Sequence, residues 1–146
     1  MRFLKIRNAD ELPERVDFHA LAVFLHENLK PYEDTIEDIK SGLEYALSNE
    51  SGKGGFIMLA ENGDRLAGAL VMLRTGMKGY VPENLLLFVA VDTDSRGEGV
   101  GGELCERAIA ECEGDVCLHV EYDNPAKRLY ERIGFESKYA EMRYSK

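Results

Sequence analysis

A glycine cluster between residues 97 and 102 has the composition of a site that binds an anion. It follows seven consecutive apolar residues, Leu85 to Val91, which predict a strand buried on both faces. Beyond it, apolar residues recur at helical spacing: Val100, Leu104, Cys105, Ala108, Ile109 and Cys112. The first N–H groups of a helix lack partners within the helix, and glycines leave them open to a phosphate. We therefore expect an anion cradle over Gly97 to Gly102, with an ordinary glycine-rich turn as the alternative.

Three known phosphate-binding patterns compete for these residues. Gly97-x-Gly99-x-x-Gly102 fits the dinucleotide fingerprint, with Glu121 or Asp123 near the spacing of its ribose-binding acid. That fold needs several further parallel strands, whereas only 44 residues follow Gly102. The loop of nucleotide triphosphatases does not fit, because no Gly-Lys-Ser or Gly-Lys-Thr follows. The third pattern is Arg96-x-x-Gly99-x-Gly101 directly after the strand.

A second block, Val120 to Phe135, reads VEYDNPAKRLYERIGF. It places a strand valine before an asparagine, then an alanine, then Leu-Tyr and Gly-Phe. Together with Arg96-x-x-Gly99-x-Gly101, this block resembles the acetyl-CoA-binding region of the GNAT superfamily of N-acetyltransferases. The resemblance covers about the last 60 residues, and the first half of the chain agrees only in its order of elements.

The resemblance implies which residues hold acetyl-CoA, the cosubstrate, and it implies no metal. The implied contacts are the backbone of the central strand and the glycine loop: Val89, Ala90, Val91, Arg96, Gly97, Glu98, Gly99, Val100, Gly101 and Gly102. Tyr130 falls on the tyrosine that in many members hydrogen-bonds the coenzyme sulfur and acts as general acid. Asn124 falls on an asparagine that often contacts the coenzyme. Spacing alone favours a core tyrosine at position 130 and a helix cap at Asn124, and the surrounding motif is what favours the catalytic role of Tyr130.

The general base is less well defined. A lysine-like amine has a pKa near ~10.4, so it arrives charged and must lose a proton before it attacks. Many GNAT members carry a glutamate near the start of the central strand, and here Glu83 just precedes that strand. His119 and Glu121, on the next expected strand, are the other candidates, acting directly or through water.

Length and composition exclude several classes of protein. The 146 residues, 45% of them hydrophobic, predict one domain spanning 1–146. The net charge of −9 argues against nucleic-acid binding. No apolar run is long enough for a membrane span or a signal peptide. Three cysteines without metal-type histidine spacing are typical of reduced core thiols in a cytoplasmic protein: Cys105, Cys112 and Cys117.

The charge is unevenly distributed, and this bears on the acceptor. Residues 27–50 hold seven acids and two bases, a net of −5, while residues 124–146 hold six bases and three acids, a net of +3. If these are more than solvated helix faces, they favour an anionic cofactor near the C-terminal half and a cationic acceptor near the N-terminal helices. The leading hypothesis is therefore an N-acetyltransferase that moves an acetyl group to a primary amine, a small cationic molecule, by direct attack in a ternary complex. The alternatives are a non-catalytic acyl-CoA-binding or sensor module, a protein N-terminal or lysine acetyltransferase, and a nucleotide-binding protein.

Periodicity and turn signals predict the order β-α-α-β-β-β-α-β-α-β, an α/β (α+β) fold. The GNAT resemblance implies the same order, in a mixed, mostly antiparallel sheet with helices on both faces. The expected strands are 3–7, 56–61, 65–74, 85–91, 116–122 and one or two within 137–144. The expected helices run from Asp10 or Pro13 to about 29, from 34 or 35 to 48, from 100 to about 112, and over 126–133. Edge strands near the C-terminus would support a homodimer.

Overall fold

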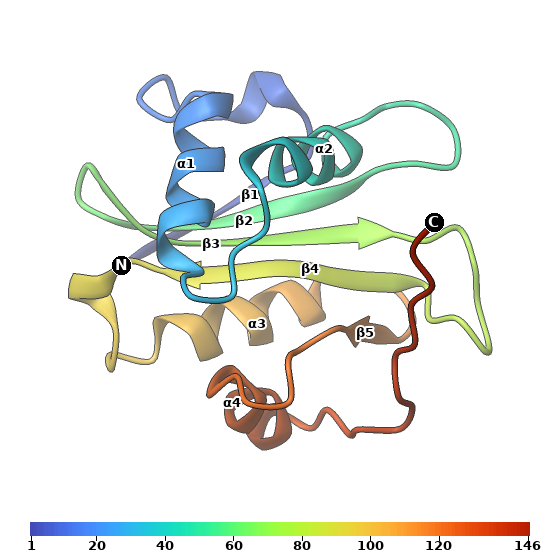
Figure 1. The fold of residues 1–146 in the computed structure, drawn as a ribbon. Coiled ribbons are helices and arrows are strands. Elements are labelled where there is room, and N and C mark those ends of the chain that lie inside the picture. Colours follow the sequence, from blue (N-terminus) through green and yellow to red (C-terminus); the bar gives the residue numbers. More distant parts are fainter.

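The computed structural model describes residues 1–146 as one five-stranded sheet with helices on both faces (Figure 1). The strands lie in sequence order: β1 (Arg2–Ile6), β2 (Gly55–Asn62), β3 (Arg65–Arg74), β4 (Asn84–Val91) and β5 (Val116–Leu118). Three neighbouring pairs are antiparallel, and only β4 and β5 are parallel. The predicted mixed, mostly antiparallel sheet is therefore confirmed.

Each face of the sheet has its own hydrophobic core. Helices α1 (Phe18–Asn28) and α2 (Ile36–Ala46) cover one face, where their buried leucines and isoleucines meet side chains of the sheet. Helices α3 (Val100–Ala110) and α4 (Ala126–Ile133) cover the other face. Gly68 of β3 brings α3 close, because a Cβ there would lie 2.8 Å from Leu104 Cδ1. None of the helices is long and apolar enough to cross a membrane.

Strand β4 changes its pairing halfway along. The β3–β4 register skips Leu87, which forms a bulge and places both Leu87 and Phe88 against Gly42 of α2. On the other side, β4 pairs with β5 only from Asn84 to Leu86. Beyond Leu86 the two strands separate, so the second half of β4 has an open edge beside α3 and α4. The strand is also not evenly buried, because buried and half-buried residues alternate along it.

The predicted start of the first helix, at Asp10 or Pro13, is wrong. Residues 9–11 form a short 3-10 turn, and α1 begins only after Asp17, whose carboxylate accepts a hydrogen bond of 2.7 Å from Ala20 N. The residues that the helix buries are Leu21, Ala22 and Leu25. His19 and Ala20 are exposed.

The C-terminal end of the sheet is shorter than predicted. β5 stops at Leu118 instead of Tyr122, and residues 137–144 form no strand. The chain turns after Val120 toward the start of α4, so the later residues have no neighbour in the sheet with which to pair. Helices α2, α3 and α4 and strands β2, β3 and β4 lie where they were predicted, within a few residues.

Candidate functional site

The glycine loop leads from β4 into α3 and leaves its backbone amides free. After the short 3-10 turn Thr93–Ser95, Gly97 and Gly99 take positive φ angles of 79° and 82°. None of the six amides from Gly97 to Gly102 donates a hydrogen bond, and the first helical bond runs from Glu103 N to Gly99 O. A Cβ at Gly97 or Gly99 would meet nothing within 4 Å, so the surface above these amides is open. The arrangement is a concave row of N–H donors at the positive end of α3.

Two arginines hold this loop in place. The guanidinium of Arg65 contacts Asp92 and Asp94 at 2.6 and 2.7 Å. Arg96 donates to Val91 O at 3.1 Å and to Asn28 O at 2.9 Å, which ties the end of β4 to the end of α1. The guanidinium of Arg96, one of the expected coenzyme contacts, is thus already engaged with two carbonyls. Of the other expected loop residues, Glu98 is exposed and Val100 buries its side chain in the core.

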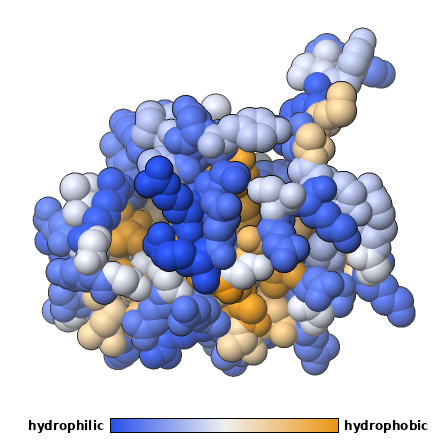
Figure 2. Space-filling model, turned by 90° about the horizontal axis from the view of Figure 1, so that it is seen from below, coloured by the Kyte–Doolittle hydropathy of each residue, from blue (hydrophilic) through white to orange (hydrophobic).

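Helix α4 lies against the first turn of α3. A Cβ atom at Gly101 or Gly102 would lie 3.6 or 3.5 Å from the Leu129 side chain. The backbone of these two glycines therefore packs close to α4. The hollow between hydrophilic side chains on this face exposes apolar surface (Figure 2). Val89 and Val91, on the open half of β4, are half-buried here.

The open edge of β4 offers backbone groups at alternate residues. Asp92 N donates to Ala67 O of β3, so strand alternation directs Ala90 toward β3 and Val89 and Val91 toward the open side. Val91 O is taken by Arg96. Of the predicted residues Val89, Ala90 and Val91, the backbone groups free to contact a bound molecule are therefore the N–H and C=O of Val89 and the N–H of Val91.

Tyr130 projects from α4 into the core under α3. It is 8% exposed, and its ring meets that of Phe135 edge to face at a centroid distance of 5.9 Å. Its hydroxyl makes no hydrogen bond within the chain. Burial, and secondarily the proximity of Cys105 and Glu121, raises the pKa of the Tyr130 phenol far above its ordinary value, so it is protonated at neutral pH.

Asn124 caps α4 and also orients Glu121. Its side-chain oxygen accepts from Ala126 N at 3.0 Å, which confirms the predicted capping role. Its amide nitrogen donates to a carboxylate oxygen of Glu121 at 3.0 Å. Glu121 is also near enough to Tyr130 to contribute to the raised pKa of its phenol.

An acidic rim, consisting of Glu33, Asp34, Glu121 and Asp123, borders the site on the side of the α1–α2 loop. Tyr32 joins its two halves, because the Tyr32 hydroxyl donates to Asp123 O at 3.1 Å. Burial, then Asp38 and Glu121, raise the pKa of Asp34 above its usual range, while Arg143 lowers it. One carboxylate oxygen of Glu33 is buried without a hydrogen-bond partner. The rim thus concentrates negative charge that nothing in the chain fully neutralises.

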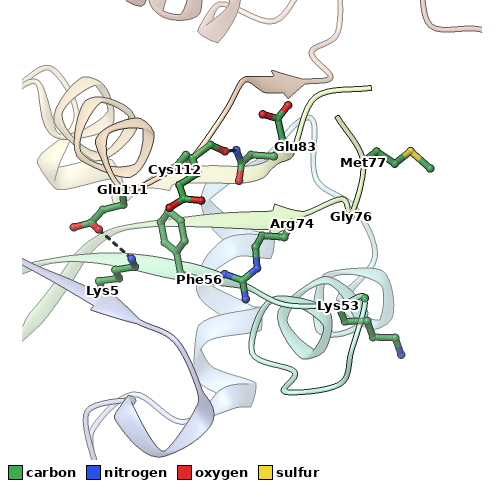
Figure 3. Close-up of a pocket in the computed structure, with 12 residues that line it drawn as sticks. Lys5, Lys53, Phe56, Arg74, Gly76, Met77, Glu83, Glu111 and Cys112 are labelled. Carbon is green, nitrogen blue, oxygen red and sulfur yellow. Dashed lines mark hydrogen bonds and ion pairs between the residues drawn. The ribbon is translucent and has the colours of Figure 1, made fainter. Parts of the chain in front are cut away.

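Glu83 lies elsewhere, in a cavity of about 690 Å³ at the start of β4 (Figure 3). Its carboxylate covers Gly114, and Arg74 and the Lys5–Glu111 pair (3.0 Å) line the same cavity. At a rise of ~3.3 Å per residue, the length of β4 separates this end from the glycine loop by about 23 Å. His119 is exposed just beyond β5 and makes no hydrogen bond.

The rim is the part of the site that sequence reasoning did not resolve. The excess of acids over residues 27–50 indicated the segment that contains Glu33 and Asp34, but it did not show which acids of that segment border the site. The Tyr32 bond to Asp123 spans 91 residues and has no sequence signature.

Comparison with known proteins agrees with this geometry. Residues 53–137 match the family described as the acetyltransferase (GNAT) domain. No curated protein sequence matches the chain. Among solved structures, a probable acetyltransferase is similar at a TM-score of 0.65 and 20% identity, covering 99% of this chain and 96% of that one.

Two further structures show the same fold. An aminoglycoside acetyltransferase from an uncultured soil metagenomic sample, in complex with sisomicin, has a TM-score of 0.63 and 15% identity, covering 99% of this chain and 95% of that one. The NatC complex bound to Gag peptide and CoA has a TM-score of 0.66 and 20% identity, covering 93% and 86%. The family match spans more than half of the chain, so the protein belongs to the GNAT family and is an acyltransferase.

Proposed function

We propose that this protein transfers an acetyl group from acetyl-CoA to the primary amine of a small cationic acceptor. The observation that carries the proposal is that one site combines three features. They are the free amides of Gly97 to Gly102, the open edge of β4, and the acidic rim. The first two suit an anionic, elongated cosubstrate, and the third suits a cation.

The residues present fit acetyl-CoA. The free amides would hold its pyrophosphate, since they are N–H donors at a helix N-terminus with open space beside Gly97 and Gly99. Val89 and the Val91 amide would bind the amide groups of the pantetheine arm along β4, much as a neighbouring strand would. When bound, acetyl-CoA supplies the activated acetyl group as a thioester. Leu129 and the half-buried valines would keep water from this arm.

The acidic rim selects the acceptor in this proposal. Burial, Asp38 and then Glu121 raise the pKa of Asp34, so the negative charges of Asp34 and Glu121 repel one another. A cationic group placed between them would relieve that repulsion, whereas a neutral amine would not. Small amines with more than one positive charge are therefore expected to bind better than neutral ones of the same size.

Glu121 is the preferred base, and Tyr130 the acid. The Glu121 carboxylate belongs to the rim, is oriented by Asn124 and lies near Tyr130, so it would take a proton from the ammonium directly or through water. Tyr130 keeps its proton and has a free hydroxyl to donate to the departing sulfur. Glu83 and His119 remain weaker candidates. Glu83 lies in the distant cavity, and His119 makes no hydrogen bond that would orient its ring.

Direct attack by the amine fits the state of the thiols. Burial raises the pKa of Cys105 to about 12 and raises the pKa values of Cys112 and Cys117 as well. A thiol of this kind is protonated and a poor nucleophile at neutral pH. A covalent acetyl-cysteine step is therefore not part of the proposal.

The test is thiol release from acetyl-CoA with a panel of amines: polyamines, aminoglycosides, amino acids, neutral amines and short peptides, each beside a control without acceptor. We expect release that depends on a cationic small amine and weakens with added salt. Release with peptides alone would replace the acceptor class by a protein N-terminus or lysine. Binding of coenzyme A in calorimetry with no release from any amine would favour a sensor module.

A further inference from the structure

The cavity at the start of β4 is separate from the acetyl-CoA site. It has a volume of about 690 Å³ and lies among the loops 47–54, 75–83 and 111–115, at the end of β4 away from the glycine loop (Figure 3). Cavities of this size commonly hold small molecules. Only three of its twelve lining residues are hydrophobic, so a molecule that fits it is polar.

Two of the three basic side chains in the cavity already have partners. Lys5 Nζ contacts a carboxylate oxygen of Glu111 at 3.0 Å. Lys53 Nζ contacts Glu50 at 2.9 Å, and its side chain extends away from the other lining residues (Figure 3). The two lysines and Glu111 are therefore neutralised within the chain and do not set the charge that a ligand meets.

Three charged groups of the lining have no partner. The guanidinium of Arg74 and the carboxylates of Glu83 and Glu113 form neither an ion pair nor a side-chain hydrogen bond within the chain. The cavity therefore offers one positive and two negative groups. Ion pairs that are also hydrogen-bonded are the strongest polar contacts available to these groups, and here only a ligand can supply them.

The backbone holds these three groups around one space. Arg74 and Asn84 are partners in the β3–β4 pairing, with Cα atoms about 4.5–5.5 Å apart, and Glu83 is the next residue along the chain. A Cβ at Gly54 would lie 2.7 Å from a guanidinium nitrogen of Arg74, so glycine there leaves room for the guanidinium. The Asn84 amide nitrogen donates to Glu113 O at 2.7 Å, which ties the loop that carries Glu113 to β4.

We propose that this cavity binds a free α-amino acid with a cationic side chain, of the size of lysine or ornithine. The α-carboxylate of the ligand pairs with the Arg74 guanidinium through two parallel hydrogen bonds. Its two ammonium groups pair with Glu83 and Glu113, so the ligand matches the unpaired groups in number and in sign. Its methylene chain lies against Phe56 and Met77, two of the apolar lining residues. The proposal does not rest on acetyl transfer.

Calorimetry with lysine, in the absence of coenzyme A, tests the site. We expect wild-type protein to bind lysine, and Arg74→Gln and Glu83→Gln each to raise the Kd by at least about tenfold through the loss of one charged contact. The Arg74 guanidinium has no partner in the chain, so Arg74→Gln should keep the fold, which a thermal melt verifies. Arg132→Gln is the matched control, because Arg132 is exposed and forms no ion pair, and it should keep the wild-type Kd.

Two analogues separate this cavity from the acceptor site. Cadaverine lacks the carboxylate of lysine, and norleucine lacks the side-chain ammonium. On Asp34→Asn, which weakens the binding of cations at the acidic rim, each analogue should bind at least about tenfold more weakly than lysine. Any binding of cadaverine at the rim should be unchanged in Arg74→Gln, because that site has no need of a guanidinium.

Three results would overturn the proposal. They are the absence of lysine binding, a Kd for lysine that Arg74→Gln leaves unchanged, and an equal loss of affinity in Arg132→Gln, which would mean a general effect of charge. Thiol release from acetyl-CoA with a polyamine is a separate readout and should be the same in Arg74→Gln and the wild type. Its absence from both would count against the proposed acetyl transfer and leave the binding result as it stands.

Discussion

Replacing Tyr130 by phenylalanine separates its proposed catalytic role from its role in the core. The ring is buried and contacts Phe135, so alanine would cost about 3–5 kcal/mol of stability and confuse the result. Phenylalanine keeps the ring and removes only a hydroxyl that makes no hydrogen bond within the chain. We therefore expect a change in the free energy of unfolding within about 0.5 kcal/mol.

The effect on catalysis should be far larger. A positioned general acid contributes about 10²- to 10⁴-fold, or roughly 3–5 kcal/mol of activation free energy. We expect kcat to fall within this range while the Kd for coenzyme A, measured by calorimetry, stays within about twofold of the wild type. Burial raises the pKa of Tyr130 well above the working range, so its ionisation does not cause any alkaline loss of activity near neutral pH.

Tyr45 provides the opposite control. Its hydroxyl lies 3.1 Å from Gly52 O and 3.0 Å from Arg74 O, on the far side of the sheet from α4. Tyr45→Phe should lose about 0.5–1.5 kcal/mol of stability, a fall in Tm of about 2–4 °C, with kcat unchanged. An unchanged kcat in Tyr130→Phe would refute the assignment, and equal losses in both variants would mean that the assay reports stability only.

Other variants test the remaining parts of the site. Gly99→Ala places a Cβ at φ +82° over the amides, so the KM for acetyl-CoA should rise at least about tenfold, with about 1–2 kcal/mol of backbone strain visible in a thermal melt. Glu121→Gln should lower kcat/KM for a cationic amine by about tenfold or more, and an unaltered kcat/KM would assign the base elsewhere. The raised pKa of Asp34 means that stability is lost as pH rises from its usual value of 3.8 through its folded-state pKa. Asp34→Asn should therefore gain no more than about 0.5 kcal/mol at pH 7 and nothing at pH 3, while its KM for a cationic acceptor rises and that for a neutral amine does not. Gly68→Ala should cost about 1–3 kcal/mol in urea unfolding, because its Cβ would press on Leu104, and a neutral effect would show that α3 can shift.

The sequence by itself determined the glycine loop, the helix behind it and the general order of the sheet. These features depend on local physics: glycines leave amides bare, apolar residues at helical spacing predict α3, and Asn124 before Pro125 begins α4. The turn between the strands predicted over 56–61 and 65–74, at Asn62-Gly63, and the start of α2 after Thr35 were equally local, and the structure has both at these positions. The same local evidence sufficed to recognise the GNAT blocks.

Only the tertiary structure decided how the pieces meet. The start of α1 depended on one hydrogen bond from Ala20 N to Asp17, and the residues after Leu118 lack a strand because no neighbour is there to pair with them. Arg96 was expected to contact the coenzyme, yet the carbonyl of Val91 and that of Asn28, 68 residues away, hold its guanidinium. The acidic rim exists because Tyr32 bonds Asp123 across the fold. Strand pairing, long-range hydrogen bonds and the desolvation of charges depend on residues far apart in the chain, and the order of amino acids does not display those distances.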